Sequence, residues 1–206
     1  MAPFKCMFPV MVFSALLCTV GSAAWAGDVK VSVTDATGKA LPDAVVFLTS
    51  PTTKTLVKPL TGSEISQVAR QFVPRVSVVT VGSAVSFPNK DTVRHHVYSF
   101  SPAKVFDLKL YAGTPTSPVV FDVPGPVALG CNIHDKMAAW LFVVDTPYYA
   151  KTGATGSITL TAIPSGNYKL HVWHPNIPVG IDTQEQPVSV SANEASVVVA
   201  LKNLSP

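Results

Sequence analysis

The sequence has little cysteine and little charge, and it has no second long hydrophobic run after its first residues. Charged residues make up 13% of the 206 positions, and no run of lysine or arginine alternates with aromatic residues. A net charge of +3 spread so thinly does not form the basic surface that nucleic acid requires, so we expect no nucleic-acid partner. Hydrophobic residues reach 48%, which is enough for one full core or two small ones.

The N-terminal segment has the pattern of an export signal. It contains one lysine, Lys5, then an apolar stretch over 8–20, and it ends in small residues that include Ala24 and Ala26. The apolar stretch is short for a membrane span. We therefore expect residues 1–26 to be a signal peptide, and we expect a periplasmic mature chain from about Gly27 without a membrane span. A retained membrane anchor is the alternative.

Removal of this segment leaves Cys131 as the only cysteine, because Cys6 and Cys18 lie before residue 27. An internal disulfide is then excluded, even in an oxidising compartment. The remaining thiol is either buried and inert, linked to another molecule, or bound to a metal, and the last is favoured if other ligands stand nearby.

Short segments rich in valine, phenylalanine, tyrosine and threonine recur along the chain, bounded by glycine, proline, asparagine or aspartate. They include "VKVSVTD", "AVVFLTS", "RVSVVTV", "HHVYSF", "WLFVVD", "SITLTAI" and "ASVVVAL". This pattern predicts an all-β fold of the sandwich or barrel type. The best helical candidate is the short segment 62–71, "GSEISQVARQ".

Two groups of strands are interleaved in the sequence. Residues 27–50 and 151–206, with the turns "ATGK" and "IPSGNY", resemble the two parts of a carboxypeptidase-regulatory-like, or prealbumin-like, β-sandwich. Residues 66–147 are then expected to form a second sandwich inserted into the first. One continuous sandwich with long loops is the alternative organisation.

Four candidate metal ligands occur in the inserted block. "RHHV" supplies His95, and the loop "CNIHDKM" supplies Cys131, His134 and Met137. Two imidazoles and a thiolate, with a thioether as a weak axial ligand, are the donor set of blue-copper centres, which cycle between Cu(I) and Cu(II). The pattern therefore predicts one copper ion.

The same block resembles a cupredoxin of the plastocyanin and amicyanin type. The spacing of Cys131, His134 and Met137 matches the amicyanin loop, and Asn89 precedes His95 by six residues, as in that family. The approach segments "VGSAVSFPNKD" and "FDVPGPVALGC" match as well. The resemblance implies a Greek-key β-sandwich, beside the smaller prealbumin-like one. It also implies an Asn89 side chain that joins the loop before His95 to the Cys131 loop. A turn residue in "PNKD" is the alternative for Asn89.

His95 and His96 are neighbours on one expected strand, so their side chains point to opposite faces. The spacing from Asn89 in the resemblance selects His95 as the ligand, which leaves His96 as a solvated side chain or a lid over the site. A ligand role for His96 is the alternative, and it requires the strand to slip by one residue. His171 and His174 lie in the other sandwich, and we expect them to be structural.

The sequence thus predicts a periplasmic electron-transport protein with an unidentified redox protein as partner. Arg94, just before His95, and Asp135 and Lys136, just after His134, differ from the proline or uncharged residues usual in the family, so we expect a charged rim to meet that partner. No set of residues for hydrolytic or acid–base catalysis stands out, and we expect no enzyme. Bacterial proteins of this kind are often catalogued under methylamine utilisation. The alternatives are copper delivery or storage, and a structural or glycan-binding protein without copper.

Overall fold

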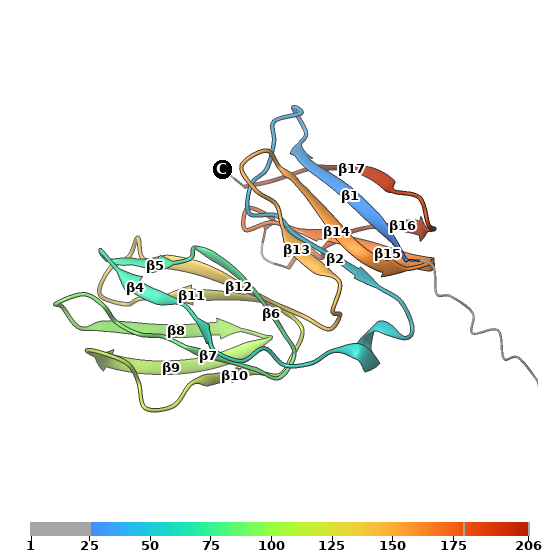
Figure 1. The fold of residues 1–206 in the computed structure, drawn as a ribbon. Coiled ribbons are helices and arrows are strands. Elements are labelled where there is room, and N and C mark those ends of the chain that lie inside the picture. The colour runs from blue at the N-terminus through green and yellow to red at the C-terminus, as the bar shows by residue number, and fades with distance from the viewer. Residues whose placement is uncertain (1–25, 179, 206) are drawn as a thin grey trace, which may run out of the picture.

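The computed structural model describes residues 26–178 and 180–205 and is all-β, as the sequence predicted (Figure 1). In this described part the only helix is a short 3-10 turn, η1 (Thr53–Leu56). The strands form two β-sandwiches. No described helix is long and apolar enough to cross a membrane. The expected signal peptide lies outside the described residues except for Ala26, which begins the first strand.

The first sandwich is built from residues 26–49 together with residues 149–201. One sheet has the order β14-β1-β17 and the other β13-β2-β15-β16. The strands are β1 (Ala26–Asp35), β2 (Val45–Thr49), β13 (Tyr149–Lys151), β14 (Ser157–Pro164), β15 (Gly166–Trp173), β16 (Gln184–Val190) and β17 (Ala195–Leu201). Burial alternates along β1, where Val29, Val31 and Val33 are fully buried, as the period of two in "VKVSV" requires.

The second sandwich is built from the middle of the chain. A five-stranded sheet, β6-β12-β11-β8-β9, is accompanied by the sheet β10-β7-β3 and the hairpin β4-β5. The strands are β3 (Ser63–Glu64), β4 (Ser66–Val68), β5 (Gln71–Val73), β6 (Val76–Thr80), β7 (Ser83–Ser86), β8 (His95–Ser101), β9 (Lys104–Tyr111), β10 (Val119–Phe121), β11 (Gly125–Gly130) and β12 (Ala138–Val144). Phe87 and Phe121 are buried in its core, which also contains Cys131 and Met137. The domain boundaries given above stay a prediction.

The segment 62–71 is not a helix, and that expectation was wrong. It forms β3 and β4, and the chain then turns at Ala69 and Arg70, which both have positive φ angles of 51° and 58°. Ile65, between the two strands, is 1% exposed in the core. Tertiary pairing therefore overrides the weak local helix preference. Because β3 pairs with β7, this sandwich also includes residues before position 66.

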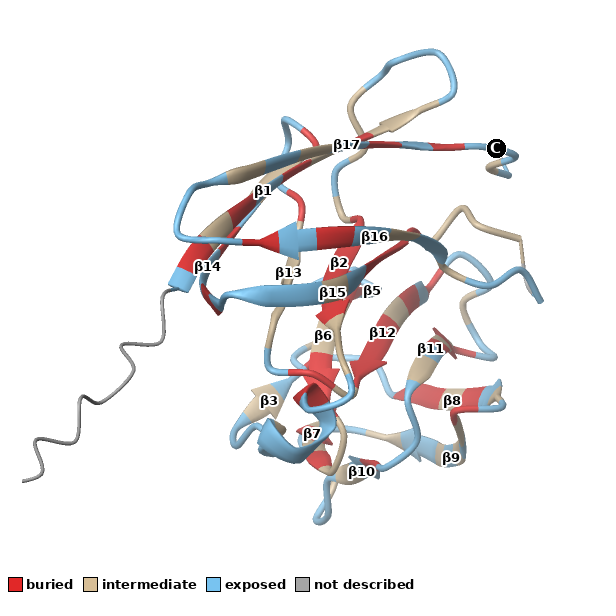
Figure 2. Cartoon of the chain, turned by 90° about the vertical axis from the view of Figure 1, so that its right-hand side faces the viewer, coloured by how far each residue is buried: buried red, intermediate tan, exposed pale blue. Residues whose placement is uncertain are grey.

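The two sandwiches meet through a cluster of buried apolar side chains from both. Its members are Val45, Phe47, Val76, Phe142, Val144 and Trp173. Phe142 of β12 packs against Trp173 of β15 with ring centroids 5.2 Å apart, and against Phe47 of β2 at 5.4 Å. Figure 2 shows the buried stretches of β2, β6 and β12 side by side at this junction. This contact holds the sheets of the second sandwich against those of the first.

Candidate metal centre

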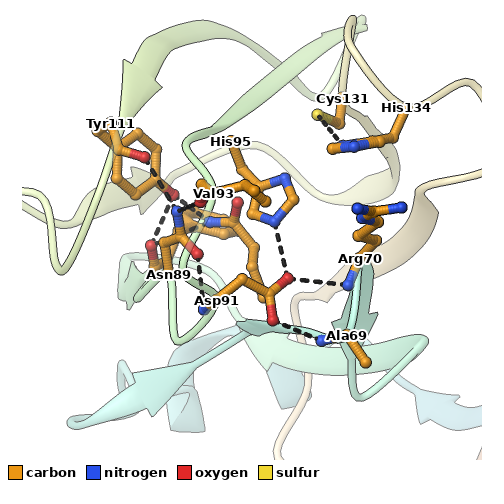
Figure 3. A network of polar contacts seen from close by, with 11 residues as sticks. Ala69, Arg70, Asn89, Asp91, Val93, His95, Tyr111, Cys131 and His134 are labelled. Carbon is orange, nitrogen blue, oxygen red and sulfur yellow. Dashed lines mark hydrogen bonds and ion pairs between the residues drawn. The ribbon is translucent and has the colours of Figure 1, made fainter.

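The structure brings together three of the four predicted ligands. One ligand atom each from His95, Cys131 and His134 lies within 4.8 Å of the others. The Sγ of Cys131 is 4.0 Å from Nδ1 of His134, and the two imidazole centroids are 5.0 Å apart. Figure 3 shows the three side chains converging from different parts of the chain.

Strand pairing explains this convergence. His95 is the first residue of β8, and Cys131 directly follows β11, the neighbouring antiparallel strand. His134 lies in the loop between β11 and β12. His95 and Cys131 are 0% and 4% exposed, whereas His134 is partly exposed. Two donors therefore lie in the protein interior, and the third is accessible at its edge.

Met137, the fourth predicted ligand, is 2% exposed and belongs to the same hydrophobic cluster as Cys131. Its backbone N–H donates a hydrogen bond of 2.8 Å to the carbonyl of His134, which closes a turn before β12 begins. The loop between β11 and β12 therefore contains a hydrogen-bonded turn over residues 134–137. A ligand role for the thioether stays a prediction.

The donor atoms fit a metal ion such as copper. Nε2 of His95 is 2.8 Å from a carboxylate oxygen of Asp91, while Nδ1 of His95 is buried and has no hydrogen-bond partner among the described residues. Buried polar atoms are normally paired, so an orphaned nitrogen beside a thiol and a second imidazole calls for a ligand. A His₂Cys set is the donor set of blue-copper sites.

Asp91 is a residue of the site that the sequence analysis missed. Its Oδ1 accepts a hydrogen bond from the backbone N–H of Ala69 at 2.7 Å, and its Oδ2 accepts one from Arg70 at 2.8 Å (Figure 3). The Arg70 N–H is the largest cause that lowers the pKa of the Asp91 carboxyl, burial opposes it, and His95 adds to the lowering. Its position four residues before His95 was the available signal, because metal-binding histidines often donate to a carboxylate.

Asn89 has a different role from the expected one. Its Nδ2 donates to the carbonyl oxygens of Val93 at 2.8 Å and Tyr111 at 3.0 Å, and its Oδ1 accepts from the backbone N–H of Asp91 at 3.0 Å. These bonds join the loop before His95 to β9. They do not reach the Cys131 loop, so that part of the expectation was wrong. The bonds of a side-chain amide depend on long-range folding that spacing does not encode.

Only 8% of His96 is exposed, so it is not a solvated side chain, and the other expected role, a lid over the site, stays a prediction. Its Nε2 pairs with a carboxylate oxygen of Asp107 on β9, and its ring lies 5.5 Å from that of Tyr98. The pairing of β8 with β9 shifts register between His95 and Val97. His96 stands apart from the group of three converging ligand atoms.

His171 and His174 lie in the first sandwich and are partnered there. His171 stacks on Phe47 with centroids 4.6 Å apart, and its Nε2 is 2.7 Å from Oγ1 of Thr49. Nε2 of His174 is 3.2 Å from the carbonyl oxygen of Pro42. Burial is the main cause that lowers the pKa of both imidazoles.

Fold and site together define a two-sandwich β-protein with a candidate His-Cys-His metal centre. Residues 141–198 match the family described as polysaccharide lyase family 4, domain II. No curated protein matches the chain.

Solved structures are similar to part of the chain, three of which illustrate the likeness. One is the Cu-containing nitrite reductase NirK from Thermus scotoductus SA-01, at 22% identity and a TM-score of 0.38, over 46% of this chain and 27% of that one. The chain thus spans about a quarter of that reductase. A purple cupredoxin from Nitrosopumilus maritimus is 21% identical with a TM-score of 0.35, over 40% of this chain and 99% of that one. An oxidized mutant of amicyanin is 14% identical with a TM-score of 0.37, over 48% of this chain and 99% of that one. The association with methylamine utilisation stays a prediction.

Proposed function

We propose that the protein is a periplasmic blue-copper protein that carries one electron at a time between redox proteins. The observation that carries this proposal is the convergence of Cys131 with His95 and His134, with Nδ1 of His95 buried and without a partner. One ion fits the one such group of three donors found among the described residues. The lone thiol of the mature chain is then neither inert nor linked to another molecule.

A copper ion at this position would supply a couple between Cu(I) and Cu(II). His95 and His134 would bind it through imidazole, Cys131 through thiolate, and Met137 would add a weak thioether donor. The buried positions of His95, Cys131 and Met137 keep water away from the donors. Because they lie on and beside the packed strands β8, β11 and β12, which resist rearrangement, these residues would hold their positions in both oxidation states.

The partly exposed edge of His134 is the natural point of exchange with a redox partner, since the other two donors are buried. Asp135 and Lys136 directly follow His134 in sequence, and Arg94 directly precedes His95. All three are exposed and would form a charged rim. We propose no bond chemistry of its own for the protein. Asp91, a carboxylate beside the ligands, is already occupied by His95 and two backbone N–H groups.

The decisive experiment is to add Cu(II) to the purified protein and record its optical and paramagnetic-resonance spectra. We expect an intense visible absorption band from the thiolate and narrow copper hyperfine splitting, both lost in Cys131→Ala. His174→Gln, a change in the other sandwich, is the matched control and should leave both spectra unchanged. A band that survives in Cys131→Ala contradicts the proposal.

Copper delivery or storage is the second candidate, and one observation favours it. Nδ1 of His96 is also buried without a partner among the described residues, directly beside His95 in sequence. A protein that binds Cu(I) tightly but gives only weak colour with Cu(II), and that loses binding in His96→Gln, would be a carrier of the metal instead. An electron carrier keeps its visible band in His96→Gln.

A further inference from the structure

We propose that Asp91 is a positioning residue that holds His95 in the tautomer with its proton on Nε2, so that the lone pair of Nδ1 faces Cys131 and His134. The proposal rests on the proposed function only for the identity of the metal. The arrangement of Asp91 and His95 is a property of the metal-free protein.

The first step is the proton on His95. A neutral imidazole carries one N–H, and a carboxylate can only accept hydrogen bonds. Because Nε2 of His95 lies 2.8 Å from Oδ2 of Asp91, the proton belongs on Nε2. Nδ1 is then left as an acceptor with a free lone pair, the form that binds a metal.

The second step is the surroundings of Nδ1. This nitrogen is buried and no described group hydrogen-bonds to it, although buried polar atoms normally find a partner. The His95 ring lies 5.0 Å from the ring of His134, and Figure 3 shows its second nitrogen turned away from Asp91. The bond to Asp91 therefore selects which nitrogen remains free for the cluster of three ligands.

The third step is what holds Asp91. Both of its oxygens accept backbone N–H bonds from the β4–β5 turn, at 2.7 Å from Ala69 and 2.8 Å from Arg70. Its own N–H donates to Oδ1 of Asn89 at 3.0 Å. Two bonds fix the carboxylate and the third fixes the backbone of Asp91, so the side chain has little freedom to rotate. The turn of the β4–β5 hairpin therefore orients a ligand on β8 through one side chain. A rigid partner of this kind commonly fixes both the tautomer and the ring orientation of a metal-binding histidine.

The test is long-range ¹⁵N–¹H NMR of the histidine rings in the metal-free protein, at about pH 8, well above the usual imidazole pKa of about 6.5. We expect His95 of the unaltered protein to be the Nε2–H tautomer. In Asp91→Asn, whose side-chain amide can donate as well as accept, we expect the Nδ1–H tautomer to become populated. Asp107→Asn is the matched control. Asp107 of β9 pairs with His96, the neighbour of His95 on β8, so this change should leave the tautomer of His95 unchanged.

A second readout is copper affinity. We expect Asp91→Asn to weaken Cu(II) binding by about 10–100-fold, the usual effect of losing such a partner, and to shift the reduction potential, while Asp107→Asn does neither. An Nδ1–H tautomer in the unaltered protein overturns the proposal. So does an Asp91→Asn variant with unchanged tautomer and affinity.

The failures of the two proposals are distinguishable. If the protein binds no copper, the proposed function fails, but the tautomer measured without metal still decides the role of Asp91. If Asp91→Asn does not fold, the tautomer of the unaltered protein decides it alone.

Discussion

The phenol ring of Tyr98 lies across Gly130, directly before the candidate ligand Cys131. The two residues are paired between the antiparallel strands β8 and β11. A Cβ atom built on Gly130 would lie 2.8 Å from both Cζ and the hydroxyl oxygen of Tyr98. The absence of a side chain at position 130 therefore lets an aromatic ring from the neighbouring strand cover the backbone beside the thiol.

Gly130→Ala should destabilise the protein by about 1–3 kcal/mol, because the added methyl group overlaps the Tyr98 ring and forces it to move. Urea denaturation measures the change in free energy of unfolding. Gly153→Ala is the control, since no heavy atom lies within 4 Å of its Cβ position. If the overlap is the cause, the cost of Gly130→Ala should largely vanish in a Tyr98→Ala background. An equal cost in both backgrounds would show that the ring is not responsible.

Met137→Leu should keep the thiolate absorption band and raise the reduction potential of the copper protein. Leucine has a similar volume, so the buried position should tolerate it at a cost below about 1.5 kcal/mol. Leucine offers no electron pair, and the loss of a weak thioether donor would destabilise Cu(II) more than Cu(I). Voltammetry of the two proteins measures the difference. An unchanged potential would mean that the thioether is core packing and not a ligand.

Trp173→Ala should destabilise the chain by about 3–5 kcal/mol, because it opens a cavity in the cluster between the two sandwiches. It should also separate the unfolding of the sandwiches into two transitions, since the ring contacts both Phe142 and Trp140. Calorimetry detects both effects. Phe100→Ala, at a ring that is 77% exposed, is the control and should cost much less. One cooperative transition of unchanged midpoint in Trp173→Ala would contradict this expectation.

The free energy of unfolding should fall as the pH drops from about 7.5 to about 5, and His171 and His174 should contribute to the fall. Burial holds the pKa of each imidazole below its usual value of 6.5 in the folded chain. The unfolded chain therefore binds more protons in this window, so this contribution to stability is complete above the unfolded pKa and is lost as the pH decreases. Glu185 beside His171 opposes the shift without reversing it.

The measurement for these histidines is urea denaturation across that pH range in metal-free protein. The double variant His171→Gln and His174→Gln should show a shallower dependence than the unaltered chain, and the difference between the two isolates these groups from the other histidines. If the free energy of unfolding depended more steeply on pH in the double variant, the two histidines would contribute with the opposite sign, and the prediction would be wrong.

Local features of the sequence were sufficient for two conclusions. The alternation in "VKVSV" predicted the buried and exposed faces of β1, because side chains on a strand alternate whatever the strand pairs with. The spacing of Cys131, His134 and Met137 placed three donors in one short loop, because a few residues cannot separate far. Both depend only on neighbours along the chain.

Only the tertiary structure decided the rest. It brought His95 of β8 to Cys131 after β11, made strands of segment 62–71, buried His96 against Asp107, and directed Asp91 to the Ala69–Arg70 turn. Each of these depends on which strands pair and in which register, and that follows from the packing free energy of the whole core. A local pattern can name a ligand, but the position of that ligand and the groups that orient it arise from contacts between segments distant in sequence.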